Sequence, residues 1–388
     1  MSFLIPILLT FITAAAWAQQ APIVVGAAVS QTGALAALAA DYRKALLLWQ
    51  DELNGAGGLL GRRVELRLHD DQSDAALAGE LYAQLIREKA DLLIGPYGSA
   101  ATLMAGAEAE RAQRVLINGA GSSLTVHKRA PRYVFQSAIS NSAYGIGILE
   151  VARSAGHQSL LILARDDQVS REMAHATRER AMEQGFKTGD LAIYRGGDDN
   201  FALFIAKASA ADVDAWIAFG ELRDTADMLR SFRKLGYAPR LFFARRAAEP
   251  KLIELVGQDA EFALAAKEYD AKFATPGNDR FAAAFAGKWS APPGLAAAEG
   301  YAAATVLADA VRRAGTLDQE KLRAVLAQME TPTVLGGYKV DPQSGEQTAA
   351  RPVVVQIQKG RPQVVWPQAL KTSTLQPYPR WSERQVLK

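Results

Sequence analysis

Residues Ile94 to Ser123, IGPYGSAATLMAGAEAERAQRVLINGAGSS, contain the pattern that decides the fold. The stretch predicts the end of a strand, a short glycine-serine loop, a helix, a second strand and a second loop of small residues. Both loops would leave a parallel sheet at the same edge. Ligands bind at that edge because loops and helix N-termini present unpaired backbone N–H groups there. The stretch therefore predicts one side of a ligand-binding site.

The same alternation of strand and helix runs along the chain from Ile23 to Ala244. Helices that separate strands at this interval act as crossovers, so the strands should be parallel. The strands are too numerous for one sheet of ordinary size. We therefore predict an α/β fold of two doubly wound parallel-sheet lobes.

The C-terminal third departs from this alternation. After a strand at Phe262 to Tyr269 and three helices, Val353 to Gln358 and Val364 to Trp366 predict a terminal hairpin around the turn Lys359-Gly360-Arg361-Pro362. Beyond Pro367 the sequence is rich in proline and weakly periodic, which predicts a surface tail.

Composition limits the class of protein. The chain has 388 residues, of which 49% are hydrophobic and 22% are charged, as expected for packed domains. A net charge of +3 without a basic run gives no reason to expect nucleic-acid binding. There is no cysteine, so disulfides and a lipid-modified N-terminal cysteine are excluded.

The N-terminus has the pattern of an export signal. Residues Met1 to Ala18, MSFLIPILLTFITAAAWA, are apolar, uncharged and end in Ala16-Trp17-Ala18, which suits signal peptidase. We expect cleavage after Ala18 and a periplasmic mature chain that is not inserted in the membrane. The alternative is a single membrane anchor, although about 15 apolar residues are short for a bilayer span.

The sequence contains no catalytic signature. It has no G-x-S-x-G, H-E-x-x-H or G-x-x-x-x-G-K motif, and its four histidines, His69, His127, His157 and His175, are isolated from one another. We therefore predict a binding protein rather than an enzyme, with no metal and no cofactor.

One acidic run, His69-Asp70-Asp71-Gln72-Ser73-Asp74, allows two interpretations. It has the side chains of a metal site. Serine and aspartate at a strand-to-helix junction more often cap the helix, because they accept bonds from its free N–H groups.

Several short motifs follow one another in a characteristic order. They are Gln31-Thr32-Gly33, Leu53-Asn54-Gly55-Ala56-Gly57-Gly58, Asp70-Asp71 with Asp74, Ile94-Gly95-Pro96-Tyr97-Gly98-Ser99, Phe135-Gln136-Ser137, Met228-Leu229-Arg230 with Leu235-Gly236, and Ala297 to Ala303 around Gly300-Tyr301. The motifs cover nearly the whole mature chain. In this order they resemble the motifs of the type I periplasmic solute-binding proteins of the branched-chain amino acid, amide and urea uptake family.

The resemblance implies two lobes that close on a ligand in the cleft between them. It implies crossing segments near residues 137–140, 267–270 and 337–341. Lobe one would then comprise residues 21–138 plus 269–338, lobe two residues 139–268 plus 339–366, and the C-terminal tail residues 367–388. The protein would bind a small molecule, as a monomer, and deliver it to the membrane subunits of an ABC permease.

The resemblance also implies ligand-binding residues in lobe one. In the amino acid binders of this family, a serine hydroxyl and backbone amides from two loops hold the ligand carboxylate. Ser99, which follows Tyr97 in the first loop, matches the serine, and Ala120, Gly121 and Ser122 match the second loop. The alternative is that Ser99 and Ser122 only cap their helices.

The chain departs from its relatives in the first loop of lobe one and in lobe two. Leu38 stands where amino acid binders carry a tyrosine, and Val169-Ser170 stands where they carry Tyr-Gly over the ligand. The ammonium-binding glutamate of the family aligns with Arg245, beside Arg246, and a guanidinium would repel an ammonium. An ordinary leucine-like amino acid is therefore disfavoured.

We expect instead a ligand with a second anionic or strongly accepting group that Arg245 binds, such as a carboxylic acid. Glu221 aligns near a ligand-contacting aromatic residue and could pair with an arginine instead. Two alternatives stay open for Arg245, a surface or interlobe ion pair and an exchange of roles with Arg246.

The favoured function is the periplasmic substrate-binding component of an ABC uptake transporter. An alternative is a ligand sensor or accessory binding protein without transport, for example one tied to a quinone-dependent alcohol oxidation system. An exported enzyme is the least favoured class, because the residues offer no assembled nucleophile and base.

Overall fold

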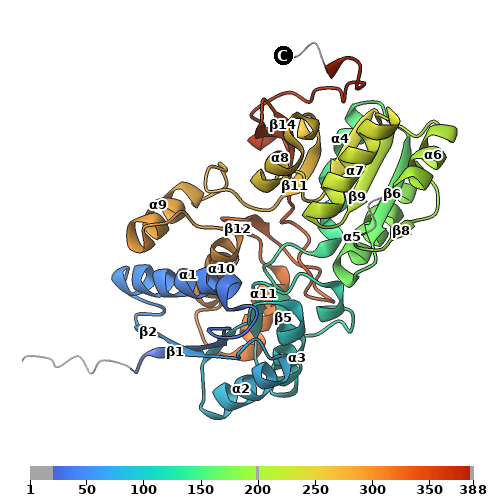
Figure 1. The fold of residues 1–388 in the computed structure, drawn as a ribbon. Helices are drawn as coiled ribbons and strands as arrows, with labels where there is room; N and C mark the ends of the chain where they lie inside the picture. The colour runs from blue at the N-terminus through green and yellow to red at the C-terminus, as the bar shows by residue number, and fades with distance from the viewer. Residues whose placement is uncertain (1–20, 198–200, 385–388) are drawn as a thin grey trace, which may run out of the picture.

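The computed structural model describes residues 21–197 and 201–384, and it consists of two parts, each built on its own sheet (Figure 1). The predicted signal peptide and its cleavage site after Ala18 lie outside the described residues. We call the part on the five-stranded sheet lobe one and the part on the eight-stranded sheet lobe two. The two-lobed α/β fold is confirmed.

The sheet of lobe one is parallel throughout, with the order β2-β1-β3-β4-β5. Its strands are β1 (Ile23–Ala28), β2 (Val64–His69), β3 (Leu92–Ile94), β4 (Leu116–Asn118) and β5 (Val134–Gln136). Successive residues of β1 and β3 enter the cores on opposite faces, because side chains alternate along a strand. Burial on both faces explains their continuous apolar sequences.

Helices cover both faces of this sheet. One face packs against α1 (Ala36–Gly55), α9 (Asn278–Trp289), α10 (Leu295–Ala314) and α11 (Gln319–Gln328), and the other against α2 (Ala75–Arg87) and α3 (Ser99–Arg111). Helix α10 lies so close to α1 that a Cβ on Gly300 would stand 2.7 Å from the carbonyl oxygen of Tyr42. The glycine and the many alanines of α10 therefore serve close helix packing.

The sheet of lobe two has the order β15-β14-β11-β10-β9-β6-β7, with β8 also beside β6. Its strands are β6 (Ser159–Arg165), β7 (Lys187–Thr188), β8 (Ala192–Tyr194), β9 (Ala215–Phe219), β10 (Leu241–Ala244), β11 (Leu264–Lys267), β14 (Val353–Gln358) and β15 (Arg361–Trp366). Only β14 and β15 run antiparallel to their neighbours among the described strands of this sheet. They form the predicted terminal hairpin.

The turn of that hairpin is shorter than predicted. Lys359 and Gly360 both have positive φ, 54° and 70°, as a two-residue turn between twisted antiparallel strands requires. Arg361 and Pro362, which we assigned to the turn, therefore belong to β15.

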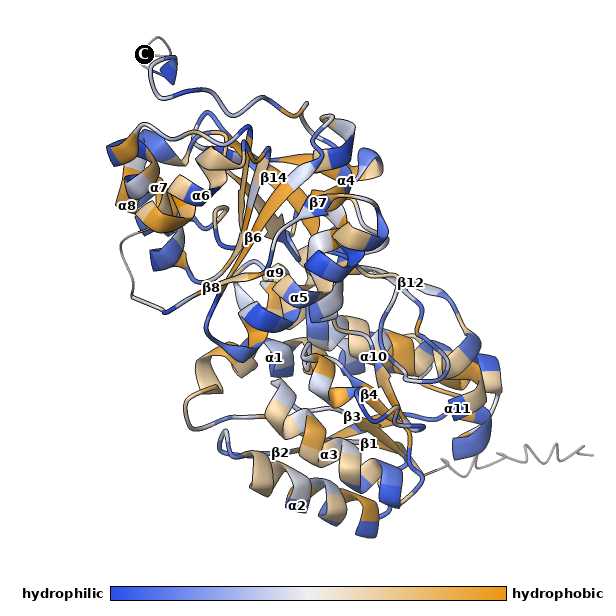
Figure 2. Ribbon diagram, turned by 90° about the vertical axis from the view of Figure 1, so that its right-hand side faces the viewer, coloured by the Kyte–Doolittle hydropathy of each residue, from blue (hydrophilic) through white to orange (hydrophobic). Residues whose placement is uncertain are grey.

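Helices also cover both faces of the sheet of lobe two, and Figure 2 shows the hydrophobic strands between them. One face packs against α4 (Tyr144–Ser154) and α5 (Gln168–Glu183), and the other against α6 (Ala202–Ala210), α7 (Leu222–Leu235) and α8 (Pro250–Val256). Helix α8 and the small hairpin of β12 (Thr331–Thr333) and β13 (Gly336–Tyr338) were not predicted. Short 3₁₀ helices complete the described chain: η1 (Leu124–Val126), η2 (Asn141–Ala143), η3 (Gly257–Ala260) and η4 (Gln368–Leu370).

The chain passes between the lobes in three segments, after β5, after β11 and before β14. Two of these segments are joined by hydrogen bonds, because Ser140 and Ser142 both donate to Glu346, at 2.6 and 2.7 Å. The lobes are thus linked by three connecting segments of the chain, as a hinge between two domains requires.

The segment after Pro367, expected as a surface tail, is in part packed against lobe two. Tyr378 is buried beside Phe242, and the indole N–H of Trp381 donates to the carbonyl oxygen of Tyr237 at 2.6 Å. Isolated aromatic residues hold this segment, which explains why periodicity did not reveal it.

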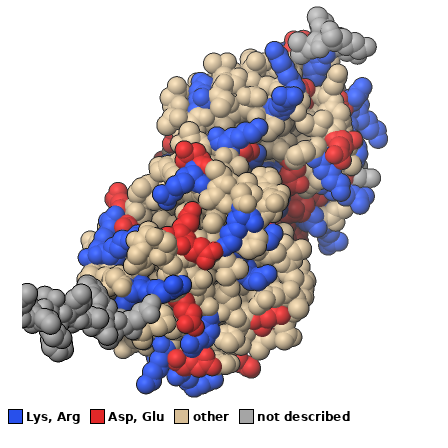
Figure 3. All heavy atoms as spheres, turned by 90° about the vertical axis from the view of Figure 1, so that its left-hand side faces the viewer, with Lys and Arg blue, Asp and Glu red and all other residues tan. Residues whose placement is uncertain are grey.

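The distribution of charge on the surface agrees with the small net charge of the sequence. Lysines and arginines are interspersed with aspartates and glutamates on the face shown in Figure 3. Among the helices of the described ranges, none combines the length and hydropathy of a bilayer span.

Candidate functional site

The first predicted loop ends at the start of α3. Gly98 precedes the helix with a φ of 96°, and no side chain caps the helix N-terminus. Ser99 is the first residue of α3, and its hydroxyl accepts a hydrogen bond from the backbone N–H of Ser123 at 3.2 Å. An uncapped helix start leaves N–H groups for an anion.

The second predicted loop is held against the first. The Asn118 side chain donates to the carbonyl oxygen of Gly121 at 2.8 Å and accepts from its N–H at 2.7 Å. A Cβ on Gly121 would lie 2.8 Å from the hydroxyl of Thr102 on α3, and one on Gly119 would lie 2.3 Å from the hydroxyl of Tyr42. Glycine is required at both positions because the loop packs so closely.

The capping interpretation of the two serines is not what the structure shows. Ser99 lies inside α3, after the N-cap Gly98. Ser123, rather than Ser122, caps η1 by accepting from Thr125. Ser122 and Ala120 are half-buried, and Tyr97 packs edge-on against Tyr42 with 5.9 Å between ring centroids.

The acidic run orders a neighbouring loop. Asp74 caps α2 by accepting from the N–H groups of Ala76 and Leu77, so the capping interpretation is confirmed. Burial would raise the pKa of Asp70, but the backbone N–H groups of Gln31 and Gln72 outweigh it and lower the pKa to about 2. No cluster of three or more metal-ligating side chains occurs within the described ranges.

The predicted residues of lobe two lie at the carboxyl ends of its strands. Val169, the second residue of α5, is 36% exposed, and Leu38 on α1 of lobe one is 57% exposed. Glu221 precedes α7, and Arg245 follows β10. The Glu221 carboxylate lies 3.4 Å from Arg245 and 3.5 Å from Arg246, so it sits between the two guanidinium groups.

The two arginines differ in their surroundings. Arg246 has a second, closer carboxylate partner, Glu249 at 2.9 Å. Arg245 is only 12% exposed, and its guanidinium lies 5.9 Å from the ring centre of Tyr144. The buried Nε of both Arg245 and Arg246 has no hydrogen-bond partner in the described chain, so the two differ in their carboxylate partners. Arg245 is therefore the less satisfied of the two guanidinium groups.

Sequence reasoning missed three residues that connect the two halves of the site. Tyr144 begins α4 and donates to Glu268, just after β11, at 2.6 Å. Glu299, on α10, is close enough to Glu268 for the two charges to interact. We call Tyr97, Tyr144, Arg245, Glu268 and Glu299 the interlobe cluster.

Two residues of the interlobe cluster, Glu299 and Tyr97, have raised pKa values. Burial, and then the charge of Glu268, raise the pKa of Glu299 to about 8. Burial, and then the charge of Glu299, raise the pKa of Tyr97 to about 12. The one sequence signal was that Glu299 is the only charged residue between Leu295 and Ala308.

The lobes also touch directly through Glu172. The carboxylate of Glu172 on α5 accepts from the Ser123 hydroxyl, the Leu124 N–H and the Asn141 amide, at 2.8, 3.2 and 2.8 Å. The second loop of lobe one is therefore connected to the first turns of α5.

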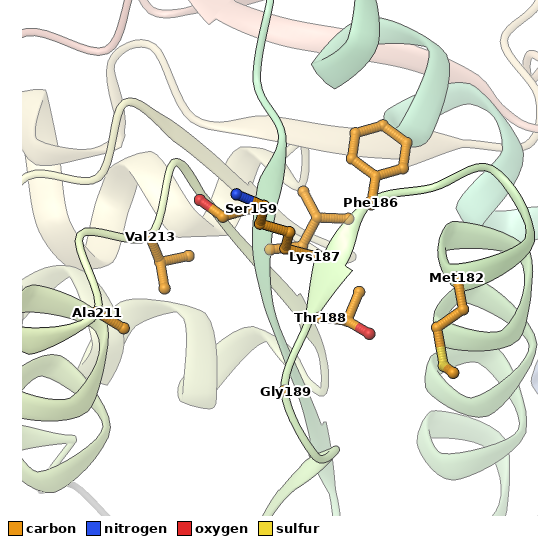
Figure 4. Close-up of a pocket in the computed structure, with 9 residues that line it drawn as sticks. Ser159, Met182, Phe186, Lys187, Thr188, Gly189, Ala211 and Val213 are labelled. Carbon is orange, nitrogen blue, oxygen red and sulfur yellow. The ribbon is translucent and has the colours of Figure 1, made fainter.

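A surface pocket at the other end of lobe two is unrelated to these loops (Figure 4). In Figure 4, Ala211 and Val213 lie on one side of Ser159 and Lys187, and Met182 and Phe186 lie on the other. Ser159 begins β6, so this pocket lies at the amino ends of the parallel strands. Ligand sites of such sheets lie at the opposite, carboxyl ends.

Comparison with known proteins shows which family the chain belongs to. A family model described as periplasmic binding protein matches residues 22–362, most of the chain. The chain belongs to the periplasmic binding protein family. Members of this family bind small ligands and work with ABC permeases; it is not a family of enzymes.

Relatives of this periplasmic binding protein include amino acid binders. The leucine-, isoleucine-, valine-, threonine- and alanine-binding protein of Pseudomonas aeruginosa is 23% identical over 309 residues, 78% of this chain and 82% of that protein. The likeness supports membership of the branched-chain amino acid group of the family.

Two solved structures share the fold. The ABC transporter substrate-binding protein from Desulfitobacterium hafniense in complex with Leu has a TM-score of 0.72 at 20% identity, covering 89% of this chain and 100% of that one. The solute-binding protein of an ABC transporter from Rhodopseudomonas palustris BisB5, in complex with 3,4-dihydroxy benzoic acid, has a TM-score of 0.67 at 20% identity, covering 93% and 99%. At these identities the likeness shows the fold alone.

Proposed function

We propose that this protein is the periplasmic substrate-binding component of an ABC uptake transporter, and that it binds a small organic carboxylate rather than a branched-chain amino acid. Its two lobes close over the ligand, which bridges surfaces that are separate in the open state. Export, with cleavage after Ala18, and delivery to an ABC permease that contacts both lobes belong to the same proposal.

In this proposal, lobe one holds the ligand carboxylate. Ser99 and the backbone N–H groups of Ala120 and Ser122 lie on two loops. The N–H of Gly121 is donated to the Asn118 side chain, so Gly121 contributes by holding the second loop in place. The uncapped start of α3 adds positive potential. Charge-assisted hydrogen bonds of this kind are about twice as strong as neutral ones.

The observation that carries the ligand class is the position of Arg245. It is nearly buried, and Glu221, its one carboxylate partner among the described residues, is 3.4 Å away and shared with Arg246. An α-ammonium group beside two guanidinium groups would be repelled. A carboxylate, carbonyl or hydroxyl oxygen would instead satisfy the buried Nε.

The Rhodopseudomonas palustris structure supports this ligand class. It shows that the fold holds an aromatic acid that has no amino group. Tyr97 and Tyr144 would offer ring surfaces to such a ligand.

Two measurements test the proposal. Mass spectrometry of ligand released from natively purified protein should identify an organic acid. Calorimetry should then show binding of an acid from a panel of 3,4-dihydroxybenzoate, benzoate and malate, and much weaker binding of leucine.

Variants test the two halves of the site. Arg245→Gln should weaken binding of the acid about tenfold or more, since a hydrogen bond to a charged group contributes about 1.5–3 kcal/mol. Arg223→Gln, on the exposed side of α7, is the matched control and should bind as the wild type does. Tight leucine binding that Ser99→Ala abolishes would overturn the proposed ligand class.

A further inference from the structure

The carboxylate of Glu172, on α5 of lobe two, accepts four hydrogen bonds where the lobes meet. Its Oε1 accepts from the Ser123 hydroxyl at 2.8 Å and from the Gln168 amide at 3.1 Å. Its Oε2 accepts from the Leu124 N–H at 3.2 Å and from the Asn141 amide at 2.8 Å. We call these five residues the Glu172 tie, because Ser123 and Leu124 belong to lobe one.

The tie reaches the loop that carries the proposed ligand donors. The backbone N–H of Ser123 donates to the Ser99 hydroxyl at 3.2 Å, and the N–H of Asn141 donates to the carbonyl oxygen of Ser122 at 2.9 Å. Ser123 is 4% exposed and Asn141 is fully buried. Glu172 is therefore connected to the second loop of lobe one through buried partners.

The same tie holds the segment that crosses between the lobes after β5. Asn141 lies in η2, and its neighbours Ser140 and Ser142 donate to Glu346 on another connecting segment. Consecutive side chains of η2 are thus bonded to two different carboxylates. A hinge motion turns the lobes about such segments, so it must change the distance between Glu172 and Ser123.

The donors of the tie need a carboxylate. The Leu124 N–H and the Asn141 NH₂ group can only donate, and the amide oxygen of Asn141 is buried with no partner among the described residues. Charge-assisted hydrogen bonds are stronger than neutral ones, and a buried donor that loses its partner is costly. The tie therefore favours the arrangement of the lobes that the structure shows.

We propose that Glu172 is a positioning residue of the binding site, which fixes the second loop of lobe one on α5 and so limits the angles between the lobes before a ligand binds. This inference rests on the proposed function for the role of the loop. Glu172 acts through Ser123 and Leu124 and need not touch the ligand. Breaking the tie lowers the fraction of molecules that are ready to bind.

Distances between the lobes test the tie without a ligand. The sequence has no cysteine, so Glu80→Cys on α2 and Glu254→Cys on α8, both exposed, provide one spin-label site in each lobe. In this labelled protein, Glu172→Gln should broaden the distribution of label distances measured by pulsed electron spin resonance. Glutamine has one acceptor oxygen, so its NH₂ group must face one of the two pairs of donors.

Glu179→Gln is the matched control, because Glu179 is an exposed carboxyl about two turns further along α5. It should leave the label distances unchanged. Ser123→Ala removes one donor from the lobe-one side and should broaden the distribution to a smaller extent. Wild-type distances in Glu172→Gln overturn the inference, and if that variant does not fold, wild-type distances in Ser123→Ala do so.

Calorimetry tests the effect on binding with 3,4-dihydroxybenzoate, or with whichever acid of the panel binds the wild type. Glu172→Gln should raise the Kd about three- to tenfold, since a loop in place for part of the time binds with a lower apparent affinity. With Ser123→Ala added, the Kd should rise by less than the product of the two single effects, because both changes break one hydrogen bond.

The outcomes separate this inference from the proposed function. An unchanged Kd in Glu172→Gln, with a wild type that binds the acid, overturns the inference alone. If no acid binds the wild type, the proposed function is overturned, and the label distances still show whether Glu172 restrains the lobes.

Discussion

The two halves of the candidate site present different kinds of hydrogen-bond donors. In lobe one the donors are mainly backbone N–H groups, placed by the start of α3 and by Gly119 and Gly121, which pack against side chains of neighbouring helices. In lobe two the donors are the guanidinium groups of Arg245 and Arg246, which share the carboxylate of Glu221.

This difference bears on which half of the proposed site would set selectivity. Backbone donors are fixed by packing and suit any carboxylate, so they need not change between relatives. Charged side chains can be exchanged without altering the fold, and each exchange changes which ligand is repelled. Under the proposed function, lobe one would provide general affinity for an acid, and lobe two would select among acids.

The largest effect should come from breaking the packing of lobe one. Gly119→Ala places a Cβ 2.3 Å from the Tyr42 hydroxyl and 2.9 Å from the Cβ of Ala303. We expect a loss of about 1–3 kcal/mol in the free energy of unfolding, measured by urea denaturation, because the loop must move.

Gly287→Ala is the matched control, since a Cβ there, in α9, would meet nothing within 4 Å. It should be neutral or slightly stabilising, because alanine favours a helix over glycine. Equal stability of Gly119→Ala and the wild type would show that the loop is not constrained by this contact.

A smaller effect should sharpen the role of lobe two. Glu221→Gln removes the carboxylate shared by Arg245 and Arg246, so both guanidinium groups become freer to bind an anion. Affinity for the acid, measured by calorimetry, should rise about three- to tenfold.

Glu254→Gln, an exposed residue on α8, is the control for this substitution and should leave the Kd unchanged. Weaker binding by Glu221→Gln would mean that Glu221 contributes to the site by holding Arg245 in place.

The smallest effect should come from Asp70, which anchors the loop between β1 and α1 but is only half-buried. Its pKa is lowered to about 2 from 3.8, so its stabilising effect is present above pH 3.8 and is lost as the pH falls through about 2. The melting temperature of Asp70→Asn should be slightly below that of the wild type at neutral pH and converge with it near pH 2.

Asp190→Asn, fully exposed in lobe two, should follow the wild type across the same pH range. A constant offset of Asp70→Asn at every pH would show that the amide disturbs the loop for reasons other than charge.

Much of the fold was predictable from local sequence. Strands such as Ala215–Phe219 and Leu241–Ala244 are short apolar runs between helices of clear periodicity, and they lie within the alternation of strand and helix predicted from Ile23 to Ala244. The missed elements, α8 and the hairpin at Thr331–Tyr338, are short and contain proline, so their patterns are too brief to recognise.

The candidate site was predictable only in part, for a related reason. Ser99 and Gly121 belong to local motifs at strand ends, so sequence reasoning could single them out. Tyr144, Glu268 and Glu299 come from three distant segments, and no local pattern connects them. The position of Glu221 between two arginines was likewise an open alternative until the structure placed it there.

Periodicity in the sequence was enough to predict the alternation of strands and helices and the two lobes, and glycine at particular turns was enough to predict the two loops at the sheet edge of lobe one. Only the tertiary structure decided which charged groups meet between the lobes. Glu299 lies in an alanine-rich helix of lobe one, and its acidity depends on Glu268, which lies next to it only after the chain has crossed between the lobes. Burial and the approach of a second charge are properties of the folded chain, and no single segment of sequence contains them.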